Sequence, residues 1–147
     1  PTRRSSDLGP GGAPARLREM LAARVLLRFD YARHHAPSID EKLAVMRQAM
    51  LERRAGHFGD EVTVLARVIE EGREAGTLAG ALGATAAARA MVAATNAFLP
   101  YSLSVRELGR RTELARRLDD VLVLLLDGLR PDGPARRTSP TRTRRSS

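Results

Sequence analysis

The strongest structural signal in the chain lies in residues 104–129, which read SVRELGRRTELARRLDDVLVLLLDGL. Ser104 and Glu107 form a Ser-x-x-Glu capping box, in which each side chain can accept a hydrogen bond from an otherwise unpaired backbone N–H group. Apolar residues then recur at helical spacing, so one long helix is predicted over 104–129. The apolar stripe consists of Leu108, Leu114, Leu118, Val121, Leu122, Leu125 and Leu129.

Residues 121–126 are apolar on every side of such a helix, so this helix needs cover from more than one direction. The first and fourth helices of the chain can supply that cover alone. The alternative is a second copy of the chain, because symmetric homodimers are the commonest soluble oligomers. We expect a homodimer whose interface includes Leu114, Leu118, Val121, Leu122 and Leu125.

Four further helices are predicted upstream, and no segment shows the strict alternation of a strand. Their ranges are 15–35, 39–55, 58–76 and 85–99, with Gly56, Gly76 and Pro100 ending the last three. A second capping box, Ser38 with Glu41, precedes the helix at 39–55. The fold class expected is therefore all-α, with about five helices.

The composition fits one domain of ordinary size: 147 residues, 43% hydrophobic, 29% charged and no cysteine. The lack of cysteine excludes disulfide scaffolds and thiolate zinc sites. No apolar run reaches the roughly 20 residues of a membrane span, and no secretion signal precedes the domain. We expect a cytoplasmic domain with no membrane partner.

The net charge of +8 is concentrated at the two ends of the sequence, and the middle is nearly neutral. Residues 1–6, PTRRSS, are echoed by residues 140–147, PTRTRRSS, and residues 1–8 resemble the translation of a sequencing adapter. We expect a helical domain at 15–130 between two disordered segments, 1–14 and 131–147, that are foreign to it. The alternative for the same arginines is a basic arm that binds phosphate or anionic lipid.

Few residues could carry catalysis. The histidines are His34, His35 and His57, and the i,i+4 pairs Asp30–His34 and His57–Glu61 could orient an imidazole, although such pairs commonly lie on a solvated helix face. The sequence contains no nucleophile elbow, zinc-binding His-Glu-x-x-His, phosphate-binding loop or dinucleotide fingerprint. We expect no enzyme activity, no metal and no cofactor.

Residues 68–78, VIEEGREAGTL, resemble a signature in the regulatory domain of the TetR/AcrR-type transcriptional repressors. In that family, as here, an alanine-rich helix and a long final helix follow the signature. Residues 96–104 and 124–129 are also similar to segments of the family, and the similarity covers roughly residues 15–130. Arginine far outnumbers lysine, which is typical of a bacterium with GC-rich codons.

The resemblance implies a bundle like the C-terminal domain of TetR, in which the last two helices pack against the same pair of a second subunit as a four-helix bundle. It also implies a small, apolar ligand among the preceding helices, with Met46, Met50, Phe58 and Phe98 as candidate lining residues by position. The helix-turn-helix of the family has no counterpart here, so we expect no DNA-binding residue, and DNA contact would require that missing N-terminal domain.

One departure from the family concerns the span between Ala15 and Gly76, where three helices are predicted and the family usually has four. The ligand pocket would then be smaller than usual or rearranged. The alternative function is a helical protein–protein interaction module that binds no ligand.

Overall fold

Five α-helices, and no strand, make up the part of the chain that the structure describes. The computed structural model describes residues 11–35, 39–103 and 105–131, except for the side chains of residues 35, 39–48, 50, 51, 54–57 and 105. The elements are α1 (Gly12–His35), α2 (Ile39–Glu74), α3 (Ala84–Asn96), the short 3-10 helix η2 (Pro100–Ser102), α4 (Val105–Leu108) and α5 (Arg111–Asp127). The predicted all-α class is confirmed.

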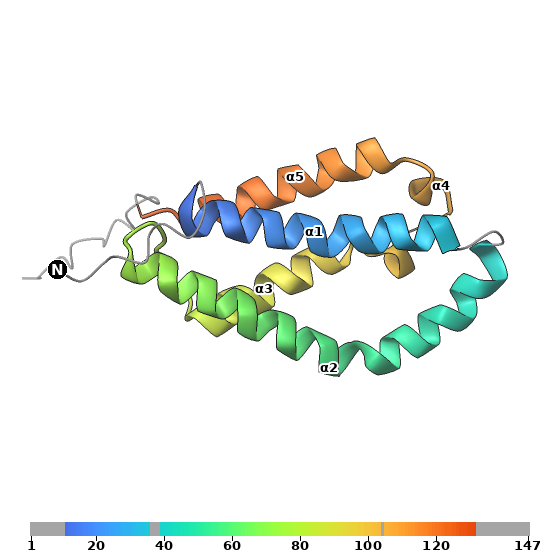
Figure 1. The fold of residues 1–147 in the computed structure, drawn as a ribbon, viewed down its shortest axis with the longest axis horizontal. Helices are drawn as coiled ribbons and strands as arrows, with labels where there is room; N and C mark the ends of the chain where they lie inside the picture. Colours follow the sequence, from blue (N-terminus) through green and yellow to red (C-terminus); the bar gives the residue numbers. More distant parts are fainter. Residues whose placement is uncertain (1–10, 36–38, 104, 132–147) are drawn as a thin grey trace, which may run out of the picture.

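Helix α1 lies at the centre of the bundle and contacts α2, α3 and α5 (Figure 1). Its buried stripe is Leu17, Leu21, Val25 and Phe29, whose spacing of four residues places them on one face of the helix. All four side chains are fully buried, and each such burial contributes about 1.5–3 kcal/mol. The core therefore forms around the helix that touches all the other long helices.

One face of α5 is covered from within the chain. Leu114, Leu118 and Leu122 are at most 2% exposed, and α5 packs against both α1 and α3. Two ion pairs join α1 to α5, one between Arg18 and Asp119 and one in which Arg111 donates two hydrogen bonds to the Asp30 carboxylate at 2.7 and 3.1 Å. Because the order of the pairs reverses along the two helices, α1 and α5 are antiparallel.

Helix α2 covers two segments, 39–55 and 58–76, that are predicted from the sequence as separate helices. Gly56 was predicted to end a helix at residue 55, and this prediction is wrong because the helix continues through Gly56 without a break. A glycine inside a helix costs only about 0.5–1 kcal/mol relative to alanine, so helical neighbours on both sides can carry the helix through it. Helix α2 bends near its middle (Figure 1).

Gly76 ends α2 as predicted, since it adopts a left-handed φ of 73°. The Thr77 N–H donates to the Gly72 carbonyl at 2.8 Å and the Gly76 N–H donates to the Arg73 carbonyl at 3.1 Å. This pair of bonds is the Schellman motif, which satisfies the carbonyls left unpaired at the end of a helix. The two glycines of the segment 68–78 thus both take part in ending α2.

The helix predicted over 104–129 is divided in two. Helix α4 ends at Leu108 and α5 begins at Arg111, so Gly109 and Arg110 interrupt the predicted helix. The apolar stripe survives the interruption, because Leu108 in α4 and Leu114 in α5 are both buried. The helix predicted over 85–99 is shorter than expected: it ends at Asn96, and Pro100 opens η2. Both capping serines lie outside the described residues.

None of the helices in the described part of the chain is both long enough and apolar enough to span a membrane.

Candidate functional site

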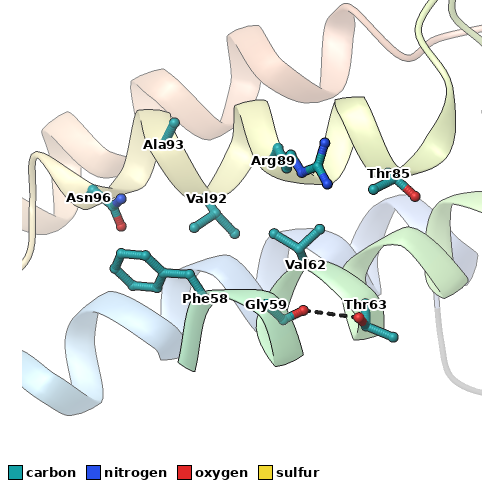
Figure 2. A pocket seen from close by; sticks show the side chains of 9 residues that line it. All are labelled: Phe58, Gly59, Val62, Thr63, Thr85, Arg89, Val92, Ala93 and Asn96. Carbon is teal, nitrogen blue, oxygen red and sulfur yellow. Dashed lines mark hydrogen bonds between the residues drawn. The ribbon is translucent and has the colours of Figure 1, made fainter. Parts of the chain in front are cut away.

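A groove of about 530 Å³ lies between α2 and α3 (Figure 2). Val62 of α2 and Val92 of α3 point toward one another across it, and the Phe58 ring lies below Asn96 at one end. The described lining residues are Phe58, Gly59, Val62, Thr63, Thr85, Arg89, Val92, Ala93 and Asn96. The groove is therefore apolar along its middle and polar toward its rim.

Small residues keep the groove open. A Cβ atom added at Gly59 would meet nothing within 4 Å, so this glycine leaves space where most residues would fill it. Ala93 contributes a single methyl group on the opposite wall. The Thr63 hydroxyl turns back along its own helix and donates to the Gly59 carbonyl at 2.9 Å (Figure 2). Short side chains therefore line part of the groove on both helices.

A buried arginine lies next to this groove. Arg24 of α1 is 8% exposed, and its guanidinium lies 5.0 Å from the centroid of the Phe58 ring. Its Nε donates to Glu61 Oε2 at 2.8 Å, Nη1 to Thr95 Oγ1 at 3.0 Å and Nη2 to Asn96 Oδ1 at 2.6 Å. Each guanidinium nitrogen thus has a partner, as a buried charge requires. These contacts join α1, α2 and α3 through one side chain.

Glu61 balances the charge of Arg24 and also binds a second arginine. Arg28 Nη2 donates to Glu61 Oε1 at 2.5 Å, while Arg28 Nη1 donates to the Arg24 carbonyl at 3.0 Å. Desolvation by burial raises the pKa of Glu61, but the hydrogen bonds and positive charges of Arg24 and Arg28 outweigh it. The net result is a pKa below the ordinary value of 4.5, so Glu61 is ionised at neutral pH.

Phe58 lines the groove, whereas Phe98 does not. Phe98 is 6% exposed and lies in the core, with the Arg117 guanidinium 5.8 Å from its ring centroid. The side chains of Met46 and Met50 lie outside the described residues. Of the four ligand-lining candidates, the structure therefore brings only Phe58 to the described groove.

The five interface candidates fall into two groups. Leu114, Leu118 and Leu122 are buried inside the single chain, so they have almost no surface for a second copy. Val121 and Leu125 are partly buried at the edge of the core. The apolar side chains that α5 leaves exposed are instead Val123, at 42%, and Leu124, at 72%.

The possible carboxylate–imidazole pair of α1 has a different arrangement from the one considered. His34 Nδ1 donates to the Asp30 backbone carbonyl at 2.7 Å, and the Asp30 carboxylate binds Arg111. The hydrogen bond from Arg111 lowers the pKa of Asp30, although burial opposes it, and the charges of Arg111 and His34 add to the lowering. The side chain of His57 lies outside the described residues. Within the described chain, no cluster of three or more acidic, histidine or cysteine side chains could hold a metal ion.

Three polar residues of the site are not among those predicted from the sequence: Arg24, Arg89 and Asn96. Arg24 carried a usable signal, because it falls on the apolar face of its helix beside Leu21 and Val25, where charged residues are rare unless paired. Arg89 and Asn96 carried none, since their roles depend on the approach of α2 to α3.

Comparison of the chain with protein-family models, with curated proteins and with solved structures found no match.

Proposed function

We propose that this chain is the ligand-sensing and dimerisation domain of a TetR-like transcriptional repressor, acting as a cytoplasmic homodimer in a bacterium. The observation that carries the proposal is the groove between α2 and α3, with its apolar middle and its contact with a buried polar network. The resemblance of residues 68–78 and the order of the helices after them support the family.

The groove has the character of a small-molecule site. Such sites are concave and mostly apolar, with a few polar groups that orient the ligand. Val62, Val92 and the Phe58 ring supply the apolar surface, while Arg89 and Asn96 supply the polar groups. The proposed ligand therefore lies between two helices rather than inside one closed cavity.

The buried network offers a way for a ligand to act on the rest of the molecule. Asn96 and Phe58 line the groove and also contact Arg24, which belongs to α1. A ligand that fits one spacing of α2 and α3 better than another stabilises that spacing by its difference in binding free energy. Through Arg24 this change reaches α1, and through α1 it reaches α5.

Binding of the neutral apolar dye Nile red to the whole chain tests the ligand part of the proposal. We expect saturable, one-to-one binding followed by fluorescence. Thr63→Trp, which fills the groove from an exposed position on α2, should weaken binding at least tenfold. The matched control is Glu70→Trp, which lies two turns further along α2 at an exposed position outside the described lining. Absence of saturable binding, or equal binding by both variants, would overturn the proposal.

A helical interaction module is the second candidate, and the exposed apolar pair on α1 favours it. Leu27 and Tyr31 lie one helical turn apart and are 68% and 63% exposed. Such a pair could pack against a partner helix. A module of this kind would bind its partner helix normally after Thr63→Trp but fail to bind it after Leu27→Glu.

A further inference from the structure

The charge in the groove comes from one side chain. Among the described lining residues Arg89 alone is ionisable, and no hydrogen bond or ion pair joins it to another described residue. Nine ion pairs occupy other arginines of the described chain, including Arg24 and Arg28 on the neighbouring helix α1. The guanidinium of Arg89 is thus a positive group at the rim whose donors remain available to a ligand.

A second polar group lies at the other end of the groove. Asn96 Oδ1 accepts from Arg24 at 2.6 Å, so its amide is held in place and its NH₂ group remains as a donor. Arg89 and Asn96 are seven residues apart on α3, or about 10.5 Å at 1.5 Å per residue. Val92 lies between them on α3, and Val62 of the facing helix is drawn below Arg89 in Figure 2.

We propose that the groove binds a monocarboxylate with an apolar body, its carboxylate on Arg89 and its body along Val92, Val62 and the Phe58 ring. This inference rests on the proposed function and names the chemical class of its ligand. A guanidinium suits a carboxylate because two parallel N–H donors match its two oxygens. The groove lining described here holds no acidic side chain that would repel the anion. A hydroxyl or carbonyl at the far end of the ligand would accept from the Asn96 amide.

Displacement of Nile red from the whole chain by two probes of equal body tests the inference. The probes are octanoate and octan-1-ol, each used below its micelle or solubility limit. Because charge-assisted hydrogen bonds are stronger than neutral ones, octanoate should bind about tenfold more tightly than octan-1-ol. Raising the ionic strength from about 0.1 M to 1 M shortens the Debye length from about 10 Å to 3 Å, so this preference should shrink.

Arg89→Gln should remove the preference for octanoate, so that the two probes bind this variant with similar affinity. Arg67→Gln is the matched control, because Arg67 is an exposed arginine of α2 outside the described lining. An equal loss in both variants would mean that the basic chain attracts anions generally, and it would overturn the inference.

The outcomes separate the two proposals. If Nile red does not bind saturably, the proposed function fails. If Nile red binds and octan-1-ol displaces it as well as octanoate does, the proposed function stands and the carboxylate inference fails.

Discussion

Arg24 joins three helices through one guanidinium group. We therefore expect its substitution to cause a large loss in the free energy of unfolding. Arg24→Met would leave the buried Thr95 and Asn96 oxygens without this donor, while Glu61 would keep Arg28 as its only partner among the described residues. A buried polar group left without its partner costs about 1–3 kcal/mol, so the loss at Thr95 and Asn96 together should be about 2–5 kcal/mol. Urea denaturation should show a loss of this size in the free energy of unfolding.

Arg28→Met provides the comparison, because Arg28 binds the same carboxylate from a side chain that is 44% exposed. Exposed ion pairs contribute about 0–1 kcal/mol, so the loss should be no larger than that. Equal losses for the two variants would show that Arg24 has no special place in the fold.

Glu61 should make the stability of the domain depend on pH in the acidic range. Its pKa in the folded chain lies below the ordinary value of 4.5, so its stabilising effect is complete above the unfolded pKa and is lost as the pH falls through the folded pKa. Urea midpoints measured from pH 6 to pH 3 should therefore fall less steeply for Glu61→Gln than for the unmodified chain. Part of the slope should remain, because Arg111 also lowers the pKa of Asp30. An unchanged slope in Glu61→Gln would contradict the argument.

At the level of helices, two glycines inside α2 should respond in opposite ways to the same substitution. A Cβ at Gly72 would lie 2.5 Å from Leu78 Cδ1 and 2.7 Å from Ala13 Cβ, so Gly72→Ala should destabilise the domain by about 1–3 kcal/mol. A Cβ at Gly59 would meet nothing, so Gly59→Ala should stabilise it by about 0.5–1 kcal/mol. Thermal unfolding of the two variants shows whether each substitution raises or lowers the stability. A higher stability for Gly72→Ala would refute the close packing at Gly72.

The helices also show what periodicity alone can predict. The apolar residues of 15–35 predict a helix, and the structure has one, in which Leu17, Leu21, Val25 and Phe29 are buried while Tyr31 is 63% exposed. Glycine is harder to interpret, because Gly56 lies inside a helix, Gly76 ends one and Gly109 falls in an interruption. The same residue type permits all three outcomes, and the neighbouring helices decide among them by packing.

At the scale of the whole molecule, the groove depends on contacts that no local pattern records. Phe58 and Asn96 are 38 positions apart in the sequence, and their approach follows from how α2 crosses α3. The all-α class could be predicted from the sequence, since apolar periodicity reports on each helix separately. The partners of Arg24 could not be predicted, because they come from two other helices.

The proposed dimer leads to a prediction about surface leucines. Leu124 on α5 and Leu27 on α1 are 72% and 68% exposed, so a glutamate at either position leaves the core intact. Sedimentation velocity at micromolar concentration should show a dimer for the unmodified chain and for Leu27→Glu, and a folded monomer for Leu124→Glu. Leu122 is 1% exposed, so Leu122→Glu should unfold the chain. A monomeric unmodified chain, or a dimer that persists in Leu124→Glu, would refute an α5 interface.

The antiparallel packing of α1 and α5 also determines how the domain would respond to mechanical force. The start of α1 and the end of α5 lie at the same end of the bundle (Figure 1). A force that pulls residues 11 and 131 apart therefore loads the contacts between these helices in sequence, with Arg18–Asp119 before Asp30–Arg111. The two helices should therefore separate one contact at a time. A force applied between residues 35 and 131 would instead act along the two helices and load all these contacts together. The domain should therefore resist this force more strongly than a force between residues 11 and 131.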